Sequence, residues 1–485
     1  MSIFPGTFIV PGTYMRFQPG APAGLSAQEH RALIIGLRLS TGTVAAETVV
    51  QALSASEAEG YHGIGSPLAM MVAAFKRHNP LVHVDTIGIA EDAGGTAATG
   101  TLTFAGTATS SGTIALYVGG RRVLVGVAKG DAAADVAAAA EDALALDPRL
   151  PATGATVAAV CTLTAVAKGA WGNDIDLRVN YYAADRTAAP AGITVTPSGS
   201  TLSGGATDPT IAAALAALPS SVRYDTIVCM FYDATSLTAL EDELADRAGS
   251  IRGIPGQAFV ALCKNYATTQ ALGDSRNSES LTIIGPGTCP ATAWEIAASV
   301  AGIDSAVTDL NAPRKGLAIV GLLPPSEAEA FDRETRNLLL IDGVSTITVE
   351  AGRMILERVI TTRQTTAGAP DPSYRDIGTR RVLNYWRADL ATWSAIRFAA
   401  HKLGEDADLT TVNPGVKLAT PAIIAGAIVE RYRLHAGAAY VGNVAGFEEA
   451  LLVSLSDEAG RADVAGTLYV LVGLHQIACD FTFEI

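Results

Sequence analysis

The last nine residues of the chain, 477–485, alternate between apolar and polar side chains. The apolar positions are Ile477, Cys479, Phe481, Phe483 and Ile485, with small or polar residues between them. A period of two is typical of a strand with one buried face, because successive side chains of a strand point to opposite sides. The pattern therefore predicts a half-buried strand that runs to the last residue.

A terminal strand needs a partner, since an unpaired edge exposes backbone hydrogen-bonding groups and promotes aggregation. The strand can pair with a sheet of its own chain. Alternatively it can complete a sheet in another copy, where backbone hydrogen bonds give affinity and alternate side chains give specificity. Burial of its four large apolar side chains would contribute roughly 6–12 kcal/mol as an upper estimate. The pattern alone leaves both alternatives open.

The first residues have too little apolar sequence for a core. Proline and glycine interrupt residues 2–24 at short intervals, and only residues 13–17, with Tyr14 and Phe17, have the pattern of a short strand. We therefore expect an extended arm over residues 1–24, with Tyr14 and Phe17 in an intersubunit strand. Two extended ends on one folded body favour head-to-tail linkage between copies, which gives rings or helical filaments.

Between the two ends, strand and helix patterns alternate. Ser66 and Pro67 begin one helix, because serine accepts hydrogen bonds from free first-turn amides and proline is tolerated at the first helical position. This rhythm predicts an α/β domain with some parallel pairing, formed by residues 25–94 and 206–370. The predicted strands are 32–37, 81–89, 226–232, 258–263 and 281–284, and the later helices are 237–248 and 291–301.

Residues 95–205 differ in composition, being rich in threonine, glycine, alanine and valine. Gly119 and Gly120 separate two strand patterns and indicate a hairpin turn. One alanine-rich helix is expected to begin at Asp131. The segment predicts a β-rich domain inserted into the α/β domain. Its strand patterns cover residues 100–104, 113–118, 121–127, 156–165 and 175–182.

The chain becomes mostly helical after Tyr374. One helix is predicted over 380–403, ending at Gly404 as a left-handed cap, and another from Pro421 to Gly437. The predicted fold class is therefore α/β and α+β, in several domains. A central α/β domain carries a β-rich inserted domain, and a mostly helical C-terminal domain, residues 371–485, ends in the strand 477–485.

Length and charge restrict the classes of function that the chain can have. A chain of 485 residues exceeds one ordinary core. It has 34 lysines and arginines against 48 aspartates and glutamates, a net charge of −14, which argues against a nucleic-acid partner. No apolar run reaches the ~18 residues of a membrane span, and no export signal is visible at the N-terminus. We therefore expect no membrane insertion and assembly in a cytoplasm.

The sequence contains no recognisable catalytic, cofactor or metal motif. There is no nucleophile elbow, no phosphate-binding loop and no H-E-x-x-H pair. Gly63 and Gly65 precede a helix, but Leu68 stands where a dinucleotide turn has its third glycine. The five cysteines have no C-x-x-C spacing and are interpreted as buried thiols. We predict a protein that is not an enzyme and needs no cofactor or metal.

Several short segments, in order along the chain, resemble the tail sheath proteins of Mu-like contractile phages. The resemblance covers nearly the whole chain and departs near residues 465–467, where a turn containing proline is expected. The segments are RALIIG at 31–36, GIGSPLAM at 63–70, GTLTFAG at 100–106, LYVGGRRV at 116–123, GAWGNDID at 169–176, TTRQ at 361–364, DPSY at 371–374 and HKL at 401–403.

The resemblance implies a subunit that polymerises with itself, as hexameric rings or a six-start helix around a tail tube. It implies that the N-terminal arm and the C-terminal strand complete sheets in neighbouring subunits, and that contraction drives the tube through the host envelope. The implied further partners are the tail tube, baseplate and tail terminator proteins, and the implied location is the virion tail. A tailocin or related injection-system sheath is a variant, and an adhesin-like protein that binds through the β-rich domain is the alternative of another class.

The resemblance also implies that the inserted domain faces outward and the C-terminal domain inward. The predicted helix 380–403 is locally basic, through Arg380, Arg381, Arg387, Arg397 and Lys402. Arg387, Arg397 and Lys402 are therefore candidates to face the tube, with an ordinary solvated or intersheath face as the alternative. Cys479, on the apolar side of the last strand, would form an intersubunit disulfide if the recipient sheet places a cysteine opposite.

Overall fold

The computed structural model describes residues 24–25, 29–413 and 415–483. The chain divides into two compact units. The large unit comprises residues 28–390 and 469–485, and the small unit comprises residues 1–27 and 391–468. The chain leaves the large unit within helix α10 (Ile377–Arg397) and returns to it at Tyr469. The domain boundaries expected from the sequence are finer than this division and stay predictions.

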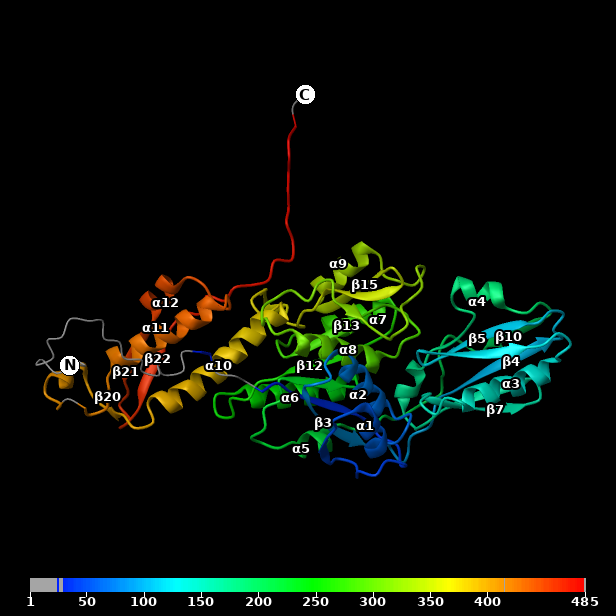
Figure 1. Cartoon of the computed structure of the whole chain (residues 1–485), viewed down its shortest axis with the longest axis horizontal. Coiled ribbons are helices and arrows are strands. Elements are labelled where there is room, and N and C mark those ends of the chain that lie inside the picture. The colour runs from blue at the N-terminus through cyan, green and yellow to red at the C-terminus, as the bar shows by residue number, and fades with distance from the viewer. Residues whose placement is uncertain (1–23, 26–28, 414, 484–485) are drawn as a thin grey trace, which may run out of the picture. The chain divides into compact units, whose positions relative to one another are not determined.

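A sheet of nine strands forms the centre of the large unit (Figure 1). Its six central strands are parallel, and antiparallel strands stand at both edges. The expected α/β domain with parallel pairing is confirmed. In spatial order the strands are β14 (Ala318–Ile319), β16 (Arg353–Arg358), β15 (Val344–Glu350), β13 (Leu281–Gly285), β12 (Gln257–Ala261), β11 (Thr226–Cys229), β1 (Arg31–Leu37), β3 (His83–Ile89) and β2 (Val49–Gln51).

Helices connect the strands of this sheet and cover it. Ser66 begins α2 as predicted, because its hydroxyl oxygen accepts a hydrogen bond from the Ala69 amide at 3.2 Å. Helix α8 is buried from Ala293 to Asp304 and packs on α2, β11 and β12. A Cβ at Gly302 would lie 2.7 Å from the Phe75 carbonyl oxygen, so glycine permits this close approach. The helices are α1 (Ala55–His62), α2 (Pro67–His78), α5 (Ala212–Ala216), α6 (Ala234–Ala248), α7 (Tyr266–Asp274), α8 (Ala293–Ala306) and α9 (Arg333–Ile341).

The chain between β3 and β11 forms the β-rich insertion. Its four-stranded sheet has the antiparallel order β10 (Ile193–Pro197), β4 (Thr99–Gly106), β8 (Val160–Ala165) and β7 (Ala152–Val157). A three-stranded sheet has the order β6 (Arg121–Val127), β5 (Gly112–Val118) and β9 (Leu177–Val179). The remaining elements are α3 (Ala133–Ala145), η1 (Ala170–Asp174) and α4 (Ala183–Ala188).

Backbone conformation at turns and helix caps accounts for the predictions in the insertion that are right and for those that are wrong. The hairpin at Gly119 and Gly120 is confirmed, with φ of 51° and 79°. The single strand over 156–165 is wrong: a turn at Ala158, with φ of 53°, separates β7 from β8. Helix α3 does not begin at Asp131. Its cap is Ala132, whose amide donates to the Asp135 carboxylate at 3.0 Å.

The described part of the small unit contains helices and two small strand pairings. Tyr432 and Phe447 stack with ring centroids 3.8 Å apart and join α11 to α12. Helix α11 begins after Thr420 and ends at Gly437, as predicted. The elements are β19 (Lys402–Leu403) paired with β20 (Leu418–Ala419), η2 (Asp406–Thr410), α11 (Pro421–Gly437), α12 (Val444–Ala450), and β21 (Leu452–Leu455) paired with β22 (Ala462–Ala465).

The predicted helix 380–403 is wrong at both ends, because α10 spans Ile377–Arg397. The chain then turns, and the His401 amide donates to the Phe398 carbonyl at 3.0 Å. Lys402 lies in β19, which pairs with β20 and not with the helix. Gly404 is not a helix cap, since its amide donates to the Ala419 carbonyl at 3.0 Å. After α10 the chain therefore forms a strand paired with β20 and does not continue as a helix to Leu403.

Candidate functional site

The C-terminal segment is the most exposed apolar stretch in the described chain. Ile477 is 75% exposed, Phe481 86% and Phe483 83%, and Cys479 is exposed as a free thiol. Residues 477–483 form no helix or strand and pair with no other described strand (Figure 1). The half-burial expected from the alternating pattern is therefore not found within the described part of this chain.

The chain immediately before this segment is held by the large unit. The Leu471 carbonyl accepts a hydrogen bond from the Asn311 side-chain amide at 2.8 Å. A Cβ at Gly473 would lie 2.7 Å from Cγ of Pro313 and 2.9 Å from the Asn311 carbonyl oxygen. Only glycine fits this close approach. The segment 471–475 thus lies directly on the loop that precedes β14.

His475 makes the last polar contact before the exposed stretch. Its Nε2 lies 3.2 Å from Oδ1 of Asp376, which also accepts two hydrogen bonds from Arg358, at 3.0 and 2.9 Å. Burial lowers the pKa of His475, although the Asp376 carboxylate opposes the shift. The contact with Asp376 is thus a polar contact between an imidazole and a carboxylate, at ion-pair distance. We call the contacts of Leu471, Gly473 and His475 the tail anchor.

The end of the predicted N-terminal arm, at Gly24, belongs to the small unit. Gly24, the last residue of the predicted arm, has its carbonyl held by Nη1 of Arg431 at 2.9 Å. Arg431 belongs to α11, is 4% exposed, and places its guanidinium over the Trp393 ring. Tyr14 and Phe17 lie outside the described residues, as does Ile485. Gly24 is thus held within the small unit, whereas the tail anchor belongs to the large unit.

The hairpin β21–β22 offers an open strand edge. Its strands pair with each other, from Leu452 with Ala465 to Leu455 with Ala462, and with no other described strand. Leu452 is 65% exposed and Val464 47%. The hairpin packs on α11, but its unpaired edges can still accept a further strand. Sequence reasoning missed this hairpin. Two short apolar runs on either side of Gly460, which has a φ of 84°, were the signal for it.

The three candidate tube-facing residues are exposed, but they differ in their surroundings. Arg387 donates through Nη1 to the Ala248 carbonyl, the last residue of α6, at 2.6 Å. Among the described residues, no hydrogen bond or ion pair of the Arg397 side chain is found. Lys402 lies in β19 beyond the helix. Arg387 belongs to the large unit and the other two to the small unit. Their role toward a tube stays a prediction.

Two other basic residues of α10 serve the fold and do not form a free basic face. Arg381 lies 2.9 Å from the carbonyl and 3.4 Å from Oδ1 of Asp304, which also accepts from Arg314 at 2.7 Å. Burial alone would raise the pKa of Asp304, but the two guanidinium groups hold it below its usual value. Arg380 is buried, and its Nη2 donates to Ser280 at 2.6 Å.

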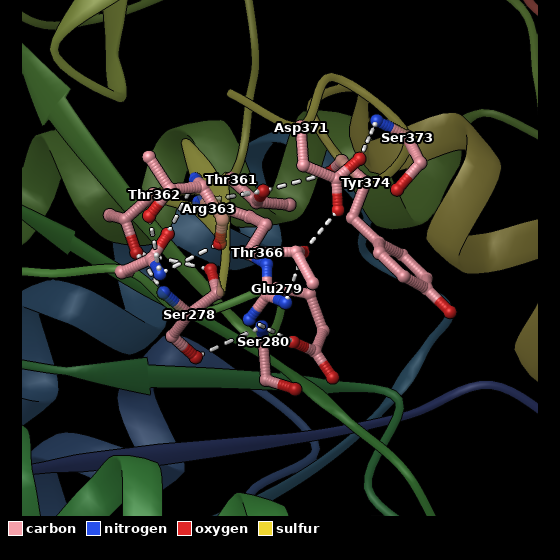
Figure 2. A network of polar contacts seen from close by, with 12 residues as sticks. Ser278, Glu279, Ser280, Thr361, Thr362, Arg363, Thr366, Asp371, Ser373 and Tyr374 are labelled. Atoms are coloured by element: carbon pink, nitrogen blue, oxygen red, sulfur yellow. Dashed lines mark hydrogen bonds and ion pairs between the residues drawn. The ribbon is translucent and has the colours of Figure 1, made fainter. Parts of the chain in front are cut away.

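A polar network next to Arg380 brings together two of the segments that carry the family resemblance (Figure 2). Thr361 donates to the Tyr374 carbonyl at 2.8 Å, which joins residues 361–364 to residues 371–374. Thr362 donates to the Ser278 carbonyl at 3.0 Å and accepts from its amide at 2.9 Å. The network fixes the chain that leads into α10. Its groups bond to one another, which indicates a structural role.

Two other functions, metal binding and membrane insertion, each need a specific arrangement of residues. No group of three or more histidine, cysteine, aspartate or glutamate side chains with metal-binding geometry occurs among them. None of the described helices combines the length and the apolar character needed to cross a bilayer. The most distinctive surface features are the exposed tail, the anchor that holds it and the open hairpin.

Comparisons with known proteins give one consistent family. The model of the phage tail sheath protein central domain matches residues 204–362. The Mu-like prophage FluMu tail sheath protein of Haemophilus influenzae is 32% identical over 424 residues, which cover 87% of this chain and 86% of the relative. This identity over most of both chains shows the family, as the resemblance of short segments predicted.

Two solved structures are also similar. A sheath tail protein of Desulfitobacterium hafniense has a TM-score of 0.49 at 14% identity, covering 95% of this chain and 100% of the other. A sheath tail protein of Listeria innocua has a TM-score of 0.47 at 15% identity, covering 92% and 96%. From the match to the prophage relative we conclude that this chain belongs to the Mu-like phage tail sheath protein family.

Proposed function

We propose that this sheath subunit joins its neighbours by donating residues 477–485 to a sheet of another copy. The observation that carries the proposal is the exposure of Ile477, Phe481 and Phe483, at 75%, 86% and 83%. A strand with one apolar face is stable only when that face is covered. Since the described part of the chain does not cover it, a second copy is the natural partner in a homopolymer.

The hairpin β21–β22 is the proposed recipient. Its unpaired edges present backbone groups, and Leu452 and Val464 present apolar side chains next to them. An added strand would bond to one edge and cover apolar surface at the same time. The second edge is available to the N-terminal arm, with Tyr14 and Phe17 as its anchoring side chains. One hairpin would thereby join three copies.

The two attachment points suggest how such a mesh bears load. A pull on the donated strand reaches the large unit through His475 and Asp376, whereas a pull on the arm reaches the small unit through Gly24 and Arg431. Each copy is then held at both of its units. Contraction requires two packings of one body in which these strand links survive. We propose that the large units repack while the links hold.

We further propose a wider setting for the subunit, which the family supports. The subunit polymerises with itself around the tail tube, meets baseplate and tail terminator proteins at the ends of the sheath, and drives the tube through the host envelope. It is assembled in the bacterial cytoplasm and resides in the virion tail, or in a tailocin of the same design. It has no catalytic activity and no nucleic-acid partner. The family assignment favours this function over an adhesin-like protein.

The test compares the full chain with a chain that ends at Gln476 and with Leu452→Asp. Both variants change exposed positions, so circular dichroism and the unfolding midpoint should match the full chain. Negative-stain microscopy and sedimentation should show tubes or rings for the full chain and dispersed subunits for both variants. Leu146→Asp, at an 85% exposed position in the insertion, is the matched control and should polymerise. Normal polymers from the shortened chain would exclude strand donation.

A further inference from the structure

Cys263 and Cys289 lie close together at one end of the large sheet. Their sulfur atoms are 3.5 Å apart, and both approach the Ala291 carbonyl oxygen, at 3.4 and 3.7 Å. Cys263 follows β12, and Cys289 lies in the loop between β13 and α8. Parallel pairing of β12 with β13 brings these residues together although 26 positions separate them. The pair has no counterpart among the other cysteines of the described chain.

The two thiols differ in access. Cys289 is 2% exposed, whereas Cys263 is only partly buried and is the more accessible of the two residues. The neighbouring Cys289 sulfur and burial raise the pKa of Cys263. Because the thiolate is the reactive form, this raised pKa slows the reaction of Cys263 with disulfides.

We propose that Cys263 and Cys289 are a modification site that closes to an intramolecular disulfide when the subunit meets an oxidising low-molecular-weight disulfide. A disulfide bond is about 2.05 Å long, so the sulfurs must approach by roughly 1.5 Å. Cys289 lies in an irregular loop, and a shift there leaves the ladder of the sheet intact. Side-chain rotation and this loop supply the approach.

The reaction proceeds by two thiol–disulfide exchanges. The Cys263 thiolate attacks one sulfur of glutathione disulfide, forms a mixed disulfide and releases one glutathione thiolate. Cys289 then attacks the Cys263 sulfur as its thiolate and releases the second glutathione. The two protein thiols are oxidised, the glutathione disulfide is reduced, and the two protons from the protein end on the two glutathione thiols.

The loop that contains Cys289, together with the start of α8, contacts the inserted domain. A Cβ at Gly120, in the β5–β6 turn, would lie 3.0 Å from Cα of Ala291. Arg121 and Glu295 form an ion pair at 3.5 Å, and the rings of Trp171 and Trp294 meet edge to face at 5.6 Å. A disulfide would tie this loop to the end of β12. It also restricts the unfolded chain, and both effects stabilise the subunit.

The test uses the full chain with Cys479→Ser, which removes intermolecular bridging and leaves four cysteines of the original five. After incubation with glutathione disulfide, denaturation and thiol titration should find two thiols per chain where the reduced protein has four. Tryptic mapping should show residues 253–264 linked to residues 277–314. The oxidised protein should melt a few degrees above the reduced protein.

Cys263→Ser and Cys289→Ala should each abolish the linked peptide and the melting shift. Cys229→Ser, at a buried thiol of the same sheet, is the matched control and should retain both. If the folded protein keeps four titratable thiols in excess glutathione disulfide, with no linked peptide, the proposed site is refuted. The outcome concerns the isolated subunit and does not depend on whether it polymerises.

Discussion

His475 lies with its Nε2 3.2 Å from Oδ1 of Asp376, the residue immediately before α10. Asp376 is fixed in turn by Arg358 of β16 through two hydrogen bonds. The chain before the exposed tail is therefore attached to the large sheet and to the start of α10. Under the proposed strand donation, this contact fixes the point at which the tail leaves the large unit.

Loss of this contact should loosen the tail without unfolding the subunit. A partly buried polar contact of this kind contributes about 0.5–1.5 kcal/mol. We expect His475→Ala to raise the rate of chymotryptic cleavage after Leu474 by about 2- to 10-fold. Gln476→Ala should leave that rate unchanged. Cleavage after Phe481, already 86% exposed, is the internal reference and should not change. Equal rates after Leu474 in all three proteins would show that His475 does not hold the tail.

The two faces of the donated strand should differ in their importance for assembly. In the proposed strand, Phe481 would lie on the apolar face and Thr482 on the opposite one. Because Phe481 is exposed in the subunit, Phe481→Asp should change the free energy of unfolding by less than about 0.5 kcal/mol. Loss of phenyl burial between copies should raise the critical concentration for polymerisation by about 10- to 100-fold, measured by sedimentation. Thr482→Asp should have a small effect. Equal effects of the two changes would contradict a one-sided strand.

The elements predicted correctly from the sequence are those whose structure depends on residues a few positions away along the chain. Ser66 caps α2 and Thr420 precedes α11, and Gly119 begins a hairpin, because each residue acts on amides or dihedral angles within a few positions. The end of α10 was mispredicted for the opposite reason. Lys402 leaves the helix to pair with Leu418, and nothing near Lys402 indicates this partner.

The candidate site shows the same limit. The alternation of Phe481 and Phe483 with polar residues could be recognised in the sequence, because the side chains of a strand repeat every two residues. The tail anchor was not readable, since Asn311 and His475 are far apart in the sequence and meet only in the folded chain. The β7–β8 turn was missed for a local reason, because Ala158 adopts a positive φ that alanine rarely adopts.

The candidate tube contact can be tested most cleanly at Arg397. Arg387 bonds to the Ala248 carbonyl, so Arg387→Glu combines any effect on the tube with a loss of about 0.5–1.5 kcal/mol in stability. Arg397→Glu lacks this complication. We expect it to keep the unfolding midpoint and to reduce co-sedimentation with tail tubes several-fold. Lys129→Glu, on the insertion, is the control for charge reversal. Unchanged binding of Arg397→Glu would remove this residue from the tube contact.

Asp176 joins the insertion to the α/β domain through a buried charged cluster. It is 4% exposed, and its Oδ2 accepts from Nε of Arg178 at 2.6 Å. Arg178 also pairs with Glu329, which accepts from the Tyr181 hydroxyl at 2.6 Å. Two carboxylates thus share one guanidinium. Burial raises the pKa of Asp176 to about 7, although Arg178 opposes the shift.

This raised pKa predicts that Asp176 makes the subunit less stable as pH rises. The folded carboxyl retains its proton up to about pH 7, whereas the unfolded one loses it near ~3.9. The folded state thus binds more protons in this range, so the contribution is present at pH 4 and is lost through pH 7. Asp176→Asn should gain on the order of 1–4 kcal/mol relative to wild type between pH 5 and 7.5, measured by urea unfolding. Asp463→Asn, in the exposed hairpin, should show no such gain. If Asp176→Asn instead loses stability relative to wild type as pH rises, the ion pair with Arg178 outweighs burial.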